Sequence, residues 1–197
     1  MKEQKTRTLF IGTGEFAVPI LEKLMAMPEV ELVGVVTQPD KPVGRKQELK
    51  GGAVKERWTA MDGNRQQLKA VEIYQPQKLR EAAAQILAET NPELIIVAAY
   101  GQMIPQEMLD YPKFSCLNIH GSLLPQLRGA VPVQMAILQG LEVTGVTIQK
   151  MVMELDAGPA LARQELSGST GPSTELRAGS PWQGLRSMTS GELMQEL

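Results

Sequence analysis

The strongest constraint on the fold is the alternation of short apolar runs with helical patterns that begins near the N-terminus. Residues 8–11 form an apolar run that stops at a Gly-Thr-Gly turn at residues 12–14. Residues 16–24 then carry apolar side chains at helical spacing, and residues 30–36 form a second apolar run rich in β-branched side chains. Because parallel strands need a crossover between them, this order of strand, helix and strand predicts a parallel α/β sheet.

The same alternation continues through the next hundred residues. Further strands are predicted at residues 71–74, 94–99, 116–119 and 143–151, and further helices at residues 79–90 and 131–138. The run at 94–99 is apolar throughout, which is typical of a strand buried on both faces. The pattern predicts a Rossmann-like, doubly wound α/β fold with a mostly parallel sheet and helices on both faces. Its last strands are not expected to be all parallel.

Composition excludes several classes of site. The chain has 197 residues, a formal net charge of −2, one Cys and one His. A single cysteine excludes an internal disulfide framework, and together with a single histidine it excludes the common multi-Cys and paired-His metal sites, so no metal is expected. The strongly apolar run at 94–100 is too short to span a bilayer, and the N-terminus lacks a signal-peptide core. We expect a cytoplasmic protein without membrane contact.

Two segments depart from the average composition. Residues 41–57 carry six basic and two acidic side chains, a local charge of +4. Basic side chains on an irregular loop are suited to phosphate contacts, although a solvated loop without a partner is the alternative. In residues 167–191, 16 of 25 positions are Ser, Gly, Thr or Pro. We therefore predict one folded domain at residues 1–166 and a tail of divergent composition, disordered or truncated, at 167–197.

The glycine-rich turn at residues 12–17 matches the pattern G-x-G-x-x-A of dinucleotide-binding folds. That fingerprint also needs an acidic residue at the end of the second strand. Here the strand ends Val-Thr-Gln-Pro at residues 36–39, and Asp40 follows only after the proline. The sequence favours glycines that allow a close strand-to-helix turn. A nicotinamide-dependent oxidoreductase is an alternative that rests on these glycines alone.

The stretch with most chemical information is Cys-Leu-Asn-Ile-His-Gly-Ser-Leu-Leu-Pro at residues 116–125. Alternate side chains of a strand share a face, so Asn118 and His120 are expected side by side at its carboxyl end, where open α/β sheets bind ligands. An amide that donates to an oxyanion and an imidazole that moves a proton suit acyl transfer. Asp156 is the best candidate for a third partner, and Cys116 is expected to be a small core residue. A hydrogen-bonded turn at a strand end is the alternative for Asn118 and His120.

Three motifs together resemble the enzymes that use 10-formyltetrahydrofolate as formyl donor. They are Asn-x-His at 118–120, Ser-Leu-Leu-Pro-x-x-Arg-Gly at 122–129 and Leu-Asp-x-Gly at 155–158. Further matches in the same order resemble the methionyl-tRNA formyltransferase family in particular. These are Phe-Ala-Val-Pro at 16–19, Val-Val-Thr-Gln-Pro-Asp-Lys-Pro-x-Gly-Arg at 35–45, Ala-Ala-Tyr-Gly at 98–101 and Thr-Gly-Val-Thr-Ile at 144–148. The resemblance covers residues 7–166.

The resemblance implies roles for particular residues. The family's catalytic residues fall on Asn118, His120 and Asp156. Its folate-binding residues fall on Tyr100, Gly101, Ser122, Leu123, Leu124 and Pro125. Its loop for the acceptor arm of initiator tRNA falls on residues 40–52, with Lys41, Arg45, Lys46 and Lys50 as the tRNA-binding residues. The implied reaction moves a formyl group from 10-formyltetrahydrofolate to the α-amine of methionyl-tRNA for translation initiation, in a monomeric enzyme without metal.

Departures from the family limit this expectation. Gln126 stands where an arginine is usual, so one cationic contact is expected to be missing. The family's linker and C-terminal β-barrel domain have no counterpart after residue 166, so we expect weak tRNA affinity and poor turnover. Two alternatives remain: a formyltransferase for a small amine, and an inactive fragment that binds folate or tRNA.

Overall fold

The computed structural model describes residues 5–44, 47–61 and 71–167. The chain divides into two compact units, Met1–Leu117 and Asn118–Leu197. Among the described residues, no helix is long and apolar enough to cross a membrane.

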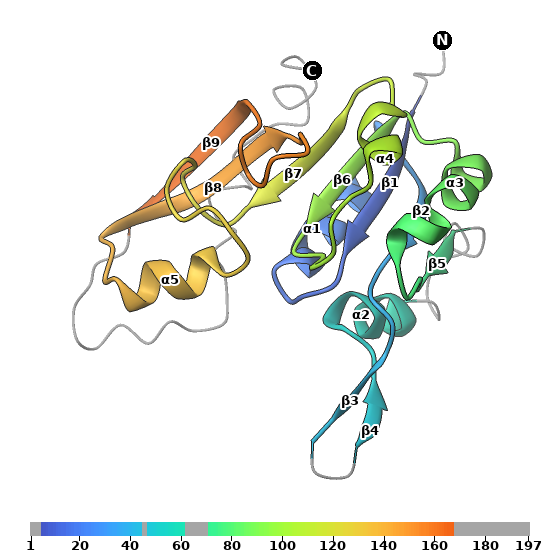
Figure 1. The fold of residues 1–197 in the computed structure, drawn as a ribbon, viewed down its shortest axis with the longest axis horizontal. Coiled ribbons are helices and arrows are strands. Elements are labelled where there is room, and N and C mark those ends of the chain that lie inside the picture. Colours follow the sequence, from blue (N-terminus) through green and yellow to red (C-terminus); the bar gives the residue numbers. More distant parts are fainter. Residues whose placement is uncertain (1–4, 45–46, 62–70, 168–197) are drawn as a thin grey trace. The chain divides into compact units, whose positions relative to one another are not determined.

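The first unit is built on a parallel sheet (Figure 1). Its sheet strands are β1 (Thr6–Gly12), β2 (Val30–Val36), β5 (Glu72–Tyr74) and β6 (Leu94–Ala98). Their order is β5-β2-β1-β6, and each neighbouring pair is parallel. The helices are α1 (Ala17–Ala26), α2 (Ala53–Met61), α3 (Leu79–Thr90) and α4 (Gln106–Asp110).

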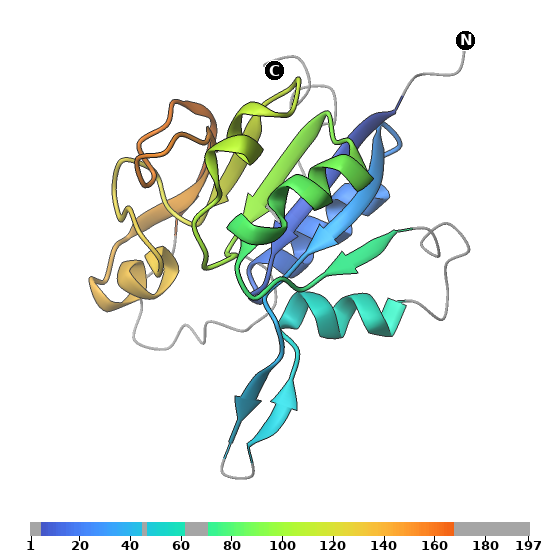
Figure 2. The ribbon, with the colours of Figure 1, turned by 45° about the vertical axis from the view of Figure 1, so that its right-hand side comes forward.

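Burial explains why this sheet forms. The apolar side chains of β6 and the centre of β1 are almost completely buried, as a strand covered on both faces requires. Figure 2 shows α3 in front of these strands and α1 behind them. The predicted fold class, a mostly parallel sheet with helices on both faces, is confirmed for this unit.

The first glycine of the Gly-Thr-Gly turn has a packing role. A Cβ atom at Gly12 would lie 2.8 Å from both the Ala17 side chain and the Ala98 carbonyl oxygen. Only a residue without a side chain lets β1 turn this closely into α1 beside β6. The prediction that glycine serves a close strand-to-helix turn is confirmed here.

The basic segment at 41–57 was expected to be irregular, and this expectation is wrong. It contains a hairpin of β3 (Lys41–Val43) and β4 (Glu48–Lys50), followed by α2. Gly44 has a φ of +71°, a conformation that glycine adopts without strain and that suits a tight hairpin turn. The buried residues of α2, Val54, Trp58 and Met61, recur at helical spacing and could have indicated the helix. Figure 2 shows the hairpin extending away from the sheet of its unit.

The second unit contains a helix and antiparallel strands. Strand β7 (Cys116–His120) crosses the division and is followed by α5 (Pro132–Leu138), β8 (Val143–Lys150) and β9 (Ala160–Ser167). The order is β7-β8-β9, and β8 pairs with β9 in the antiparallel sense. The prediction that the last strands are not all parallel is therefore confirmed. Residues 168–197 lie outside the described residues, so the tail and its boundary at residue 166 stay predictions.

Candidate active site

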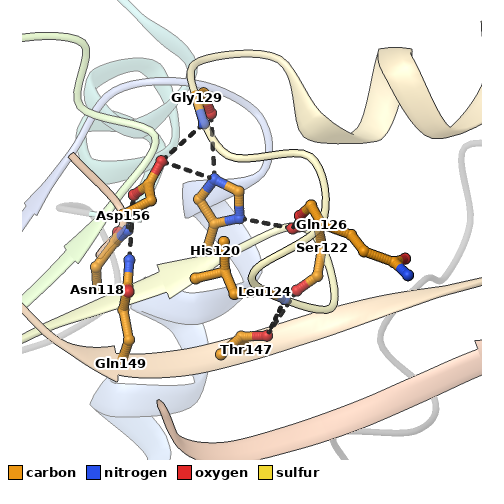
Figure 3. A network of polar contacts seen from close by, with 9 residues as sticks. All are labelled: Asn118, His120, Ser122, Leu124, Gln126, Gly129, Thr147, Gln149 and Asp156. Atoms are coloured by element: carbon orange, nitrogen blue, oxygen red, sulfur yellow. Dashed lines mark hydrogen bonds and ion pairs between the residues drawn. The ribbon is translucent and has the colours of Figure 1, made fainter. Parts of the chain in front are cut away.

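Asn118 and His120 come from one face of β7 and both reach Asp156 (Figure 3). Asn118 Nδ2 lies 3.4 Å from Asp156 Oδ1, and His120 Nε2 lies 3.3 Å from Asp156 Oδ2. All three residues belong to the second unit. The structure thus brings together the three residues that the sequence singled out, although Asp156 follows His120 by 36 positions.

Asp156 sits in the turn after β8, with a φ of +49° that aspartate tolerates better than most residues. The backbone N–H of Gly129 donates to its Oδ2 at 2.8 Å, and Gln149 Nε2 donates to its Oδ1 at 3.1 Å. Burial acts to raise the pKa of Asp156, but hydrogen bonds from His120, Gly129 and Gln149 outweigh it and lower the pKa below its usual range. The side chain is therefore a carboxylate at neutral pH.

The hydrogen bonds around His120 fix the orientation of its ring. Ser122 Oγ donates its one proton to the Gln126 carbonyl at 2.6 Å, so at 3.0 Å from His120 Nδ1 it accepts the Nδ1 proton. Nε2 lies 3.1 Å from the Gly129 carbonyl and close to the Asp156 carboxylate. Both ring nitrogens thus face acceptors, and a proton that arrives on Nε2 is held between a carbonyl and a carboxylate.

Thr147 holds the loop after β7 against β8. Its hydroxyl donates to the Ser122 carbonyl at 2.7 Å and accepts from the Leu124 N–H at 3.0 Å. Of the predicted folate-binding residues in this loop, Ser122 and Leu124 are buried, Leu123 is half-buried and Pro125 is exposed. The backbone of the loop is therefore held in place on both sides of Leu123.

Sequence reasoning missed Thr147 and Gln149. Both are buried polar residues, two positions apart on β8. Since alternate residues of a strand share a face, two polar side chains at this spacing on either side of Ile148 were a signal that this face serves a site.

The departure at Gln126 does not affect this network. Its backbone carbonyl accepts from Ser122, while its side chain is exposed and points away from His120 in Figure 3. An arginine at this position would have the same backbone role. The difference between glutamine and arginine therefore concerns only the exposed side chain and its contacts with a bound substrate.

Tyr100 and Gly101, the other predicted folate-binding residues, lie in the first unit. The Tyr100 carbonyl accepts from Thr13 Oγ1 at 3.3 Å and from Gln38 Nε2 at 2.6 Å. The ring is 3% exposed, and burial raises the pKa of its hydroxyl to about 12. Gly101 has a φ of +85°, and a Cβ there would lie 2.6 Å from Gln38 Nε2. These contacts fix the turn after β6, and its role toward folate stays a prediction.

The hairpin places two of the predicted tRNA-binding lysines opposite each other, because Lys41 pairs with Lys50 across β3 and β4. Lys41 Nζ donates to Gln38 Oε1 at 2.5 Å, and Lys50 Nζ lies 3.9 Å from an exposed Glu56 carboxylate. Like charges directly opposite on a hairpin destabilise it unless an anion joins them. Arg45 and Lys46 lie outside the described residues.

A separate ion pair fixes the base of the hairpin. Lys55 Nζ lies 2.6 Å from Asp40 Oδ2, and Gln75 Nε2 donates to Asp40 Oδ1 at 2.8 Å. Both hydrogen bonds lower the pKa of Asp40, and the bond from Lys55 has the larger effect. Lys55 is thus already paired, which leaves Lys41 and Lys50 as the described hairpin lysines able to meet an external anion.

Cys116, two residues before Asn118, is a core residue. Its side chain is 1% exposed, and burial raises the pKa of the thiol to about 12. Because the nucleophilic form of cysteine is the thiolate, this thiol is inert at neutral pH. We expect Cys116→Ala to retain the wild-type reaction rate and to lose about 1 kcal/mol of stability through reduced packing. Turnover and urea unfolding measure the two effects, and an inactive but folded variant would contradict this assignment.

The second unit therefore holds an amide, an imidazole and a carboxylate in contact at the end of a strand. The imidazole and carboxylate can hold and move a proton, and the amide can donate to an oxygen that gains negative charge. Within the described ranges, no group of three His, Cys, Asp or Glu side chains is placed to hold a metal ion. The fold and the site together define a class of α/β proteins whose site is suited to acyl transfer.

Comparisons with known proteins identify the family within this class. Residues 5–171 match the family described as Formyl transferase, so the chain belongs to the formyl transferase family. Over 163 residues it is 48% identical to the methionyl-tRNA formyltransferase of Bacillus licheniformis and 45% identical to that of Bacillus subtilis. These matches cover 82% of this chain and 48% of each relative, so the chain spans about half the length of the curated relatives it matches. The resemblance inferred from the sequence is confirmed.

Solved structures support the fold. The phosphoribosylglycinamide formyltransferase of Bacillus halodurans superposes with a TM-score of 0.64 at 20% identity, over 83% of this chain and 80% of that one. At this identity the likeness concerns the arrangement of helices and strands alone. It agrees with the doubly wound fold expected from the sequence.

Proposed function

We propose that this chain transfers a formyl group from 10-formyltetrahydrofolate to the α-amine of methionyl-tRNA, the reaction that prepares the initiator tRNA for translation. The contact of Asn118, His120 and Asp156 carries the proposal, because it supplies a donor and a proton carrier side by side. The similarity to methionyl-tRNA formyltransferases supports methionyl-tRNA as the acceptor of the formyl group. We propose that the reaction takes place in the cytoplasm, where aminoacylated tRNA is used.

The proposed chemistry begins with the neutral amine. Its lone pair attacks the formyl carbon, a C–N bond forms, and the carbonyl oxygen becomes an oxyanion. Asn118 Nδ2 donates to this oxygen, and His120 assists once its Nε2 holds the proton taken from the amine. The bond between the formyl carbon and N10 of the folate then breaks, and its electron pair stays on N10. One proton leaves the amine and one reaches N10, so the folate product is tetrahydrofolate.

His120 and Asp156 handle the protons in this scheme. The Nδ1 contact to Ser122 and the Nε2 contacts to Gly129 and Asp156 hold the ring in one orientation. The carboxylate stabilises the imidazolium that forms when Nε2 takes a proton. Because Asp156 is a carboxylate at neutral pH, its charge is available throughout the reaction.

The acceptor tRNA is proposed to contact the hairpin. Its total charge is strongly negative, whereas this chain has a net charge of −2, so attraction must come from a local basic surface. Lys41 and Lys50, which face each other, form the described part of that surface. A phosphate between them would relieve their mutual repulsion.

Replacing both lysines with alanine is expected to weaken tRNA binding. With about one phosphate lost per lysine, the slope of log affinity against log salt should become shallower by about two. Binding is measured by filter retention at several salt concentrations, and binding of the folate donor should not change. Lys23→Ala, which removes an exposed lysine from α1, is the matched control. An unchanged salt slope in the double variant would contradict the hairpin assignment.

The proposed function itself is tested by direct assay. The protein is incubated with 10-formyltetrahydrofolate and charged initiator tRNA, and in parallel with small amines such as glycinamide ribonucleotide. We expect formyl-methionyl-tRNA as product. Formylation of a small amine with no reaction on tRNA would favour the other acceptor. Binding of folate or tRNA without turnover of any amine would indicate a binding fragment.

A further inference from the structure

One oxygen of the Asp156 carboxylate is shared by two amides. Asp156 Oδ1 accepts from Asn118 Nδ2 at 3.4 Å and from Gln149 Nε2 at 3.1 Å, as Figure 3 shows. Hydrogen bonds of this kind usually span 2.7–3.2 Å. The bond from Asn118 is therefore long and weak, and the bond from Gln149 is the stronger of the two.

Gln149 is unusually placed for a polar side chain. It is 2% exposed, on the face of β8 that it shares with Thr147. A carboxylate only accepts hydrogen bonds, so the NH₂ group of Gln149 must face Asp156 and its Oε1 must face away. Among the described residues, no donor reaches this buried Oε1. A buried acceptor without a donor lowers stability, so an apolar side chain would serve a purely structural role better.

We propose that Gln149 is a positioning residue that anchors Asp156 and thereby leaves the Asn118 amide available to the substrate. This inference rests on the proposed function, in which Asn118 donates to the oxyanion. When the Asn118 amide turns to the formyl oxygen, Asp156 Oδ1 loses its weaker donor and keeps Gln149. The carboxylate then stays in the same orientation, with Oδ2 between the Gly129 N–H and His120 Nε2.

Gln149→Met separates this role from packing. Methionine has a similar volume and removes the donor, so Asn118 becomes the single side-chain amide that can hold Oδ1. We expect kcat to fall about tenfold, as the loss of one hydrogen bond in the transition state predicts, with the KM for tRNA nearly unchanged. Gln164→Met on β9 is the matched control, because the hydrogen bond of the Gln164 side chain goes to the backbone carbonyl of Glu165 and not to Asp156. The control should retain wild-type kcat.

A double variant tests whether Gln149 acts through Asp156. In an Asp156→Asn background, Gln149→Met should cause little further loss of kcat, because the group that Gln149 positions has changed. A loss as large as in the wild-type background would show that Gln149 acts elsewhere and would overturn the proposal. Thermal unfolding of each variant shows that it is folded, and we expect a midpoint close to that of the wild type for Gln149→Met.

A second measurement needs no substrate. The chain has four aspartates, so the carboxyl signal of Asp156 can be assigned by comparison with Asp156→Asn and titrated by ¹³C NMR. His120 is the one titratable side chain of the described residues that contacts Asp156. The pKa of Asp156 should be higher in Gln149→Met than in the wild type, because a donor to the charged form is lost. An unchanged pKa overturns the proposal, whether or not the protein formylates tRNA.

Discussion

Replacing Asp156 with asparagine is expected to lower kcat for formyl transfer by about 10²–10⁴-fold, the usual contribution of acid–base catalysis. The carboxylate contacts His120 Nε2, and a proton on that nitrogen needs its negative charge nearby. Asparagine keeps the size of the side chain and tolerates the φ of +49°, whereas alanine would add backbone strain. The loss of rate therefore reports the loss of charge.

The lowered pKa of Asp156 also sets the direction of pH dependence. Its pKa in the folded protein lies below its unfolded value, so the charged form is favoured in the fold. The stability that it contributes is fully present above the unfolded pKa and is lost as pH falls through the folded pKa. Wild-type urea unfolding should thus show a steeper loss of stability in this acidic range than Asp156→Asn.

Asp110→Asn is the matched control for both measurements. Asp110 is an exposed aspartate at the end of α4 that accepts from Gln106. This variant should keep wild-type kcat and the wild-type dependence of stability on pH. If Asp156→Asn also kept near-normal turnover, the proton-handling pair would have to be sought elsewhere in the chain.

The parts of the fold that could be predicted are those with a long apolar pattern. The helix expected at 79–90 is α3 with the same bounds, and the strand expected at 94–99 is β6 to within one residue. Other elements, which are short or exposed, could not be predicted in this way. Helix α4 has five residues, and β9 alternates exposed and half-buried residues at the edge of its sheet. Their formation depends on contacts that are distant in sequence.

The same distinction applies to the site. Asn118 and His120 could be paired because the geometry of one strand places them on the same face. Asp156 was found through its position in a second motif. The spacing of Thr147 and Gln149 could indicate a site on this face of β8, but the contact of Gln149 with Asp156 depends on the turn that returns the chain after β8. The arrangement of Thr147 against the loop at 122–124 likewise depends on how β8 packs beside that loop.

His120 offers the second large expected effect, because it is the single histidine of the chain. We expect His120→Asn to lower kcat by about 10²–10⁴-fold. Asparagine can place its amide nitrogen near the position of Nδ1 and keep the contact with Ser122, but it has no group at the position of Nε2. The affinity for the folate donor, measured by titration calorimetry, should change little, since the buried loop that is predicted to contact folate is held by Thr147.

A single imidazole also gives a direct spectroscopic test. The ring proton on the carbon between the two nitrogens gives one histidine signal in the NMR spectrum, assigned without any variant. Addition of a non-hydrolysable formyl-folate analogue should shift this signal, because the formyl oxygen would lie beside Nε2. Any limb of the pH–rate profile that has histidine character must disappear in His120→Asn, since no other imidazole can replace it. Two results would contradict this role: a wild-type histidine signal that does not shift when the analogue is added, and an unchanged pH–rate profile in the variant. Together they would assign proton transfer to a group other than His120.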